Sequence, residues 1–322
     1  MSTFTLAVNA TIPLFLIIAL GFFLQKIGFL NEKFNKTANE LVFRCALPVS
    51  LFRSIAGMDF YSDFDLRFCL FCFLVTTVMF LGTWGLAALF IKNRGQVGAF
   101  SQAAVRSSAA VLGIALAVNI YGDSGMVPMM IMSSVPFFNV YSVLILSFSP
   151  KVDEDGHLLP ASKGFEAVKK ALFNVVTNPL ILGIVAGLPF SLLRIPIPTV
   201  LDNALSSVAA TATPLALLVV GASFSGTQAI KSWSGALLAS FVKLILLPAL
   251  FLPLAVKLGF RQSELVAILI MAGSPTTVAC YVMARNMQAD GPLTANTILL
   301  STVLSSVTIT LWLYLLLQMG WI

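Results

Sequence analysis

The stretch Ser274-Pro275-Thr276-Thr277 places a proline among hydroxyl side chains in the middle of an apolar segment, residues 264–286. A proline inside a helix lacks a backbone N–H, and its ring clashes with the carbonyl four residues earlier. In a bilayer, the freed backbone groups need partners from protein, water or a ligand. Broken helices at membrane depth are typical of transporter binding sites. We therefore predict that this stretch binds a solute; the alternative is a kink around which neighbouring helices pack.

A second polar stretch occurs in an earlier apolar segment, residues 98–121. There Arg106 directly precedes Ser107 and Ser108, and Gly113 follows. Charged residues at membrane depth are rare and are functional candidates by default. We predict that the Arg106 guanidinium attracts a bound carboxylate and that the serines hydrogen-bond to it. The alternative for Arg106 is that its head group extends to the cytoplasmic surface.

The other charged residues of the apolar segments bear on the charge of the ligand. Lys243 lies deep and either binds the anion or pairs with helix-end carbonyls, whereas Arg44 and Arg53 are close enough to segment ends to reach the surface. No Asp or Glu falls at the centre of an apolar segment. Carriers coupled to protons or sodium commonly bind the ion with such a carboxylate. The pattern favours an anionic substrate and leaves open whether H+ or Na+ is a coupling ion.

Two asparagines complete the candidate set. Asn139 lies in residues 125–148, and Asn178 precedes Pro179 near the start of a later apolar segment. Each is equally suited to hydrogen bonds between helices and to contact with a ligand. One His and four Cys form no metal-site pattern, and no catalytic motif stands within an apolar segment. We expect no metal, no cofactor and no enzymatic activity.

The composition indicates a protein of the lipid bilayer. Of 322 residues, 58% are hydrophobic and 10% are charged, whereas soluble domains carry about 25% charged residues. The net charge of +6 resides in short loops between apolar segments, so it does not indicate nucleic-acid binding. The first apolar run is too long for a signal peptide, and we predict that it is retained as a membrane helix.

We predict ten membrane-spanning helices in two groups of five, residues 1–148 and 171–322, joined by a hydrophilic linker at 149–170. Basic residues gather in the loops on one side, and the excess of positive charge marks the cytoplasmic side. Both termini are therefore predicted outside and the linker inside. The opposite loops hold only Arg67, Arg194, Lys257 and Arg261. The predicted spans are residues 6–25, 39–57, 66–91, 98–121, 125–148, 171–192, 205–224, 234–257, 264–286 and 293–318.

Weak internal repeats relate the two halves. Pro13 and Pro179 are 166 residues apart in the numbering, as are Pro48 and Pro214. Because each half has an odd number of predicted spans, a duplicated half must insert upside down, and inverted repeats are common in transporters. We also predict that Pro48, Pro214 and Pro275 interrupt their helices.

Three stretches resemble the auxin efflux carrier family. They are NELVFRCALPVSLF at 39–52, TNPLILG at 177–183, and SPTTVA at 274–279 followed by YVMA at 281–284. The match covers nearly the whole chain. The short linker is similar to that of the bacterial members, some of which are assigned to malonate and other small carboxylates, and differs from the long loops of the plant auxin exporters.

The resemblance implies an all-α fold similar to that of bile-acid symporters, with two inverted five-helix repeats. Helices 4 and 9 would be broken and would cross at the substrate site. It further implies a location in the bacterial inner membrane and, by analogy, a homodimer through the scaffold helices. The family often has Asn, Gly and Pro at the fourth-helix crossover, where this chain has Ser108, Gly113 and Ala115.

We therefore predict a secondary transporter of a small organic anion, a carboxylate such as malonate or an auxin-like acid, that works by alternating access. The alternatives are a sodium-coupled symporter of a larger amphipathic anion and a membrane sensor that binds a ligand without transport. The predicted substrate-binding residues are Arg106, Ser107, Ser108, Gly113, Asn139, Asn178, Ser274, Pro275, Thr276 and Thr277.

Overall fold

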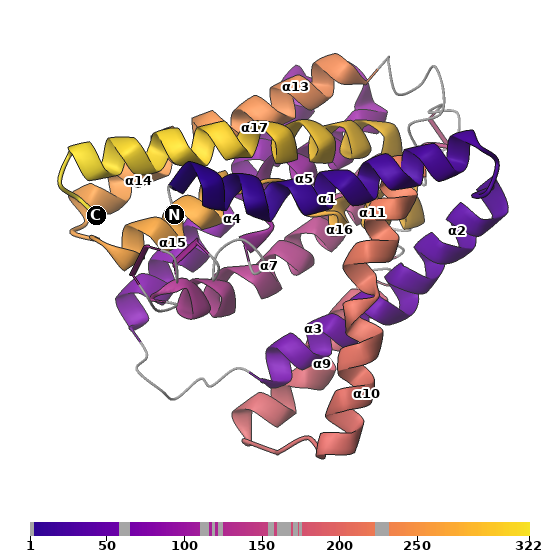
Figure 1. The fold of residues 1–322 in the computed structure, drawn as a ribbon, viewed down its shortest axis with the longest axis horizontal. Coiled ribbons are helices and arrows are strands. Elements are labelled where there is room, and N and C mark those ends of the chain that lie inside the picture. The colour runs from indigo at the N-terminus through magenta and orange to yellow at the C-terminus, as the bar shows by residue number, and fades with distance from the viewer. Residues whose placement is uncertain are drawn as a thin grey trace.

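The computed structural model shows a chain folded into helices (Figure 1). It describes residues 3–57, 65–109, 116–117, 120–121, 125–153, 158–159, 169, 173, 176–222 and 232–322, with the side chains of 3–12, 14 and 15 outside the description. Within these residues there is no β-strand, and the extended pairs are the isolated bridges Ser107–Thr276 and Val152–Leu158. Helices satisfy their own backbone hydrogen bonds, as a bilayer requires.

Five helices of the described chain are long and apolar enough to cross a membrane. Each corresponds to a predicted span, so the prediction of an all-α membrane protein is confirmed. They are α4 (Leu66–Phe90), α7 (Val127–Phe148), the pair α10 (Thr199–Ala210) and α11 (Ala212–Ala222), the continuous run α13 (Trp233–Phe241), η3 (Val242–Leu246) and α14 (Leu247–Lys257), and α17 (Gly291–Gln318).

Shorter or distorted helices account for the other predicted spans. The first is α1 (Thr3–Lys26), and the second runs through α2 (Glu32–Leu41), η1 (Val42–Ala46) and α3 (Leu47–Ala56) without a break. In the sixth, the structure describes α9 (Pro179–Leu192), and of the predicted residues before it only 173 and 176–178 are described. The fourth and ninth contain shorter helices, which are α5 (Val97–Val105, after η2 at Arg94–Gln96), α15 (Ser263–Gly273) and α16 (Ala279–Asn286).

Prolines within the long helices distort them locally. Pro48 and Pro248 each follow a π-helical turn, η1 and η3 respectively. The wider turn removes the clash between the proline ring and the carbonyl four residues earlier without ending the helix. Pro214 lies three residues after Thr211, which separates α10 from α11.

Glycines allow two helix pairs to pack backbone against backbone. A Cβ on Gly21 of α1 would lie 2.3 Å from the Leu218 carbonyl oxygen of α11, and a Cβ on Gly187 of α9 would lie 2.8 Å from the Phe52 carbonyl oxygen of α3. Any side chain larger than hydrogen would force these helices apart. The pairs α1–α11 and α3–α9 are therefore held at very short separation.

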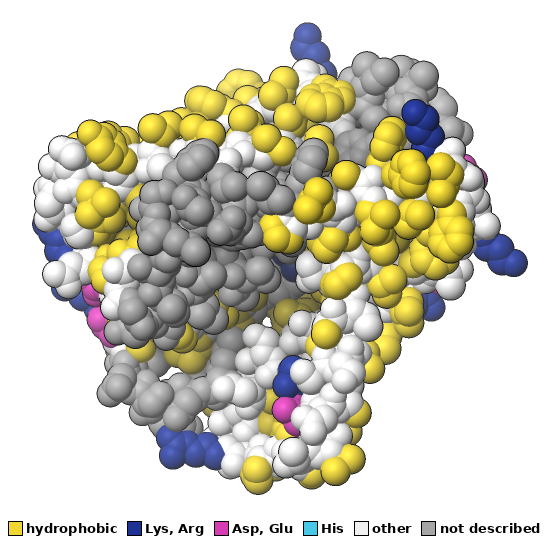
Figure 2. Space-filling model, viewed as in Figure 1, with side chains coloured by type: hydrophobic (Ala, Val, Ile, Leu, Met, Phe, Trp, Pro, Cys, Tyr) yellow, Lys and Arg dark blue, Asp and Glu magenta, His cyan; other side chains and the backbone are white. Residues whose placement is uncertain are grey.

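The helices form two groups in Figure 1. Helices α4, α5, α7 and α13 to α17 make a broad block, while α3, α9 and α10 project from it. The two chain ends lie toward the same side of the view. Hydrophobic side chains spread over the visible face, and most of the visible Lys and Arg side chains lie at its edges (Figure 2), the distribution expected for a surface in contact with lipid.

Candidate functional site

The interruption of α15 follows from Pro275. The residue before a proline is driven toward extended dihedral angles, and Ser274 has φ −75° and ψ 159°. Helix α15 therefore ends at Gly273, and the next helix, α16, begins at Ala279. The backbone between them is non-helical within a predicted membrane span.

A second extended segment lies against the first, although it contains no proline. After the end of α5, Arg106 has φ −68° and ψ 125°. Ser107 and Thr276 form an antiparallel bridge, and the Ser108 amide donates to the Pro275 carbonyl at 2.9 Å. We call this junction of residues 106–108 and 274–276 the crossover.

Lys243 binds the carboxyl-terminal ends of both interrupted helices. Its ammonium is fully buried and donates to the carbonyls of Val105 at 2.6 Å and Ala272 at 3.1 Å. It also contacts the Ser107 hydroxyl and, at 3.4 Å, the Met271 carbonyl. The last carbonyls of a helix lack intrahelical partners and carry partial negative charge. Of the two alternatives for Lys243, the structure shows the pairing with helix-end carbonyls.

Arg106, the first residue of the crossover, is buried and has no acidic partner among the described residues. Its side chain is 5% exposed, and its guanidinium donates to the Asn139 side-chain oxygen and to the Met283 sulfur. Asn139 is oriented by its own amide, which donates to the Val135 carbonyl at 2.9 Å. Within the described residues, no Asp or Glu lies within ion-pair distance of Arg106. A buried charge without a counterion is unfavourable by several kcal/mol, so an anion bound here would be stabilised.

The hydroxyls of the crossover differ in what they contact. Thr276 donates to the Ala103 carbonyl at 2.7 Å, and Ser107 donates to the Met271 carbonyl. These two side chains hold the crossover together. The Ser274 hydroxyl is fully buried and has no hydrogen-bond partner among the described residues, which leaves it available to a bound molecule. Two further hydroxyl residues of the predicted set, Ser108 and Thr277, are half-buried at the same place.

Gln102 belongs to the site, although the sequence analysis did not select it. It is fully buried, and its amide nitrogen donates to the Cys280 carbonyl at 3.0 Å, whereas its side-chain oxygen has no partner in the described part of the chain. It lies one helical turn before Arg106 in α5. The sequence feature that could have identified Gln102 is a glutamine within an apolar segment, because an amide side chain at membrane depth needs a hydrogen-bond partner.

The structure does not bring all the predicted residues together. Gly113 lies outside the described residues. Asn178 caps α9, where its oxygen accepts from the Leu180 amide at 2.9 Å, and its nitrogen faces the Met287 sulfur at 3.8 Å. Met287 follows the last residue of α16, about 12 Å along that helix from the crossover. Asn178 is therefore separate from the crossover.

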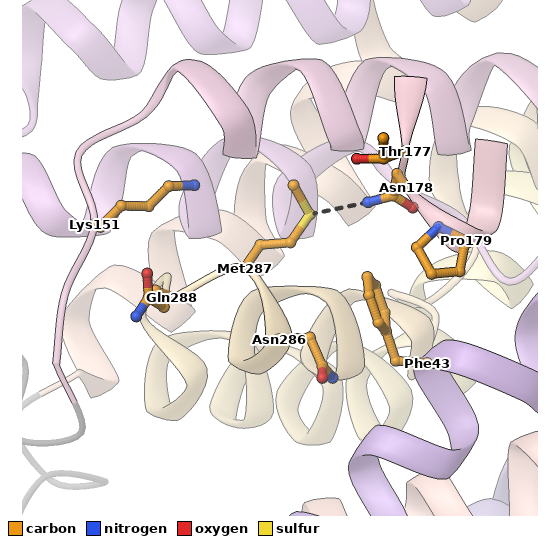
Figure 3. Close-up of a pocket in the computed structure, with 8 residues that line it drawn as sticks. All are labelled: Phe43, Lys151, Thr177, Asn178, Pro179, Asn286, Met287 and Gln288. Carbon is orange, nitrogen blue, oxygen red and sulfur yellow. Dashed lines mark hydrogen bonds between the residues drawn. The ribbon is translucent and has the colours of Figure 1, made fainter. Parts of the chain in front are cut away.

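Asn178 lines a pocket of about 250 Å³ at that end of α16 (Figure 3). Lys151 and Asn178 extend toward Met287 from opposite sides of the pocket (Figure 3). The lining residues are Phe43, Lys151, Thr177, Asn178, Pro179, Asn286, Met287 and Gln288.

Asp290 ties the loop after the pocket to η2 and α17. Its carboxylate accepts from the Leu293 amide at 2.8 Å, which caps α17, and from the Gln96 side chain at 2.9 Å. Burial raises the pKa of Asp290, although these two hydrogen bonds act in the opposite direction.

Comparison with known proteins agrees with a transport role. The sequence profile of the family described as "Membrane transport protein" matches residues 6–313. The chain is 24% identical to an uncharacterized transporter of Methanothermobacter thermautotrophicus over 94% of this chain and 96% of that protein. It is 23% identical to the uncharacterized transporter YfdV of Escherichia coli K12, over 96% of this chain and 98% of that protein.

Proposed function

The chain belongs to the membrane transport protein family, the family of the auxin efflux carriers, and we propose that it is a secondary transporter of a small organic anion. The anion binds at the crossover and passes by alternating access. The observation that carries this proposal is the Arg106 guanidinium, buried beside the crossover with a side-chain amide and a thioether as its hydrogen-bond partners. Of the five N–H donors of an arginine, several remain for a carboxylate.

Groups around Arg106 complete an anion site. The unpartnered Ser274 hydroxyl can donate to a carboxylate oxygen. Helix α16 starts at Ala279, next to the crossover, and the amino-terminal end of a helix favours negative charge. Malonate and other small mono- and dicarboxylates, or an auxin-like acid, are the substrate class that fits these donors.

The position of Lys243 favours this anion carrier over a sodium-coupled symporter. Sodium is bound by oxygen ligands, and exposed carbonyls of broken helices are the usual source in transporters. Here an ammonium already engages the carbonyls of Val105 and Ala272. A proton or an exchanged anion is the better candidate for coupling.

The architecture that we propose is the ten-helix inverted repeat, with the linker in the cytoplasm and both ends outside the bacterial inner membrane. Supporting this, Gly21 and Gly187 are 166 positions apart, the spacing of the sequence repeats, and each packs on a backbone carbonyl of a partner helix. The α1–α11 and α3–α9 pairs would form the scaffold, as a monomer or a homodimer, and the block with the crossover would move against it.

The test is uptake of radiolabelled carboxylates into proteoliposomes, with and without sodium or a pH gradient. We expect saturable flux of at least one small carboxylate without sodium, and a loss of about 100-fold in Arg106→Gln. Arg44→Gln is the matched control, because Arg44 is also within a predicted span but is exposed. Absence of saturable flux across a broad panel would overturn the proposal, and binding without counterflow would favour the sensor.

A further inference from the structure

The pocket at the far end of α16 has the chemistry of an anion site of its own. Lys151 supplies a positive charge, and Asn178 and Gln288 supply amide groups. Helix α9 begins at the pocket with Asn178 as its cap, so its positive end faces the same space. Among the lining residues that the structure describes there is no Asp or Glu. Charge and dipole both favour a negatively charged ligand.

The remaining walls suit an apolar body attached to that charge. Phe43 comes from η1, and Pro179 opens α9. Met287 lies between Lys151 and Asn178 in Figure 3, and its sulfur is the partner of the Asn178 amide nitrogen at 3.8 Å. A thioether is a weak acceptor, so a carboxylate oxygen would replace it with a gain in hydrogen-bond strength.

The pocket lies one helical turn from the residue that Arg106 contacts. Met287 and Met283 are four residues apart on α16 and its C-terminal cap, which places them on one face about 6 Å apart along the axis. The sulfur of Met283 accepts from Arg106, as that of Met287 accepts from Asn178. Two weak sulfur acceptors therefore stand between the pocket and the buried guanidinium.

We propose that this pocket is a second anion site, in which Lys151, Asn178 and the start of α9 hold a small organic carboxylate before it displaces Met287 and Met283 and reaches Arg106. The inference rests on the proposed function for the identity of the ligand. The site itself is defined by contacts separate from the crossover, so the two can be tested apart.

The first experiment measures the charge preference of the pocket directly. Met287→Cys is introduced into the Cys45→Ser background, because Cys45 is the half-buried cysteine and Cys69, Cys72 and Cys280 are buried. The purified protein is labelled with the anionic sulfonatoethyl and the cationic trimethylammonioethyl methanethiosulfonates, and rates are normalised to a free thiol. We expect a threefold to tenfold preference for the anionic reagent, and slower labelling in the presence of malonate.

The second experiment adds a negative charge to the pocket with Asn178→Asp and compares it with the same substitution outside the pocket. Aspartate caps a helix as well as asparagine does, so the Leu180 contact is kept while the amide donor is lost and a negative charge is added. We expect it to abolish the anionic preference. Asn203→Asp adds the same charge at an exposed position of α10 and should leave the preference intact. Equal rates for both reagents, or equal behaviour of the two Asp variants, would overturn the proposal.

Flux measurements separate this proposal from the function on which it rests. In proteoliposomes, Asn178→Asp should raise the half-saturating concentration several-fold at an unchanged maximal rate, whereas Arg106→Gln should lower the maximal rate. Carboxylate flux without a labelling preference for the anionic reagent would contradict the second anion site and support the proposed transport function. A labelling preference for the anionic reagent together with malonate protection, but no flux, would support the second anion site and contradict the proposed transport function.

Discussion

Arg106 and Met283 are joined by a hydrogen bond from a buried guanidinium to a thioether sulfur. The two residues belong to different halves of the crossover region, since Arg106 directly follows α5 and Met283 lies in α16. Sulfur is among the weakest acceptors in proteins, whereas a guanidinium forms its strongest bonds with carboxylates. Met283 thus occupies a position that a carboxylate would fill more favourably.

A carboxylate tethered at Met283 should therefore block the site. We expect Met283→Glu to keep the stability of the protein within about 1 kcal/mol, because the new charge pairs with one that was already buried. It should also remove the rise in melting temperature that we expect malonate-like acids to cause in the native protein. Thermal shift of the purified protein with and without ligand measures both effects.

Met130→Glu is the control for the burial of a glutamate. Met130 is fully buried in the apolar core around α7, so its replacement should destabilise the protein by several kcal/mol. A ligand-induced shift that survived in Met283→Glu would contradict the displacement of Met283 by the substrate.

We expect removal of the Lys243 ammonium to lower the stability of the protein, whether or not a ligand is bound. Lys243→Met leaves the carbonyls of Val105 and Ala272 unpaired, at a cost on the order of 3 kcal/mol. Lys257→Met is the control, since Lys257 is exposed at the end of α14. Arg106→Gln removes an unpaired buried charge, so it should not lower the melting temperature of the ligand-free protein. If Lys243→Met were as stable as Lys257→Met, the ammonium would not hold the helix ends.

Asp290 should make stability depend on pH. Burial raises its pKa in the folded protein above the value of about 3.9 in an unfolded chain. The folded state then binds more protons than the unfolded state between the two pKa values, so stability falls as pH rises from about 4 through the folded pKa. Asp290→Asn keeps the cap on α17 and should flatten the fall of melting temperature as pH rises above about 4.

Asp65→Asn tests whether that flattening is specific. Asp65 caps α4 through the Phe68 amide at 3.0 Å, so its replacement is the same chemical change at another helix. The pH dependence should persist in Asp65→Asn. A slope unchanged in Asp290→Asn would show that the Asp290 carboxyl titrates alike in both states.

The two interruptions of the crossover differ in how far the sequence predicts them. Pro275 acts on its immediate neighbours, so the end of α15 follows from local sterics. The end of α5 at Arg106 has no such local cause. It depends on Lys243 and on the pairing of Ser107 with Thr276, residues far away in sequence, and no local pattern encodes those contacts.

Two other residues, Asn178 and Met283, have roles in the structure that differ from the sequence-based prediction. A polar side chain within a predicted span, such as Asn178, predicts either contact with a ligand or a hydrogen bond between helices. An asparagine directly before a proline also makes a helix cap, which is the role the structure shows. The sequence does not mark Met283 as a site residue, because a methionine in an apolar segment predicts packing. Its importance comes from the guanidinium that happens to face it, and this requires the three-dimensional arrangement of α5 and α16.

Gly221 tests the close packing on which the proposed scaffold depends. A Cβ on Gly221 of α11 would lie 2.0 Å from the Ile18 carbonyl oxygen of α1, so Gly221→Ala must push the helices apart. We expect a loss of about 1–3 kcal/mol in the free energy of unfolding. Gly82→Ala in α4 has nothing within 4 Å of the added Cβ and should stabilise the helix by about 0.5–1 kcal/mol. Chemical unfolding in detergent compares the two variants. Equal stability would mean that α1 and α11 separate readily, and two helices that separate readily cannot serve as a rigid scaffold.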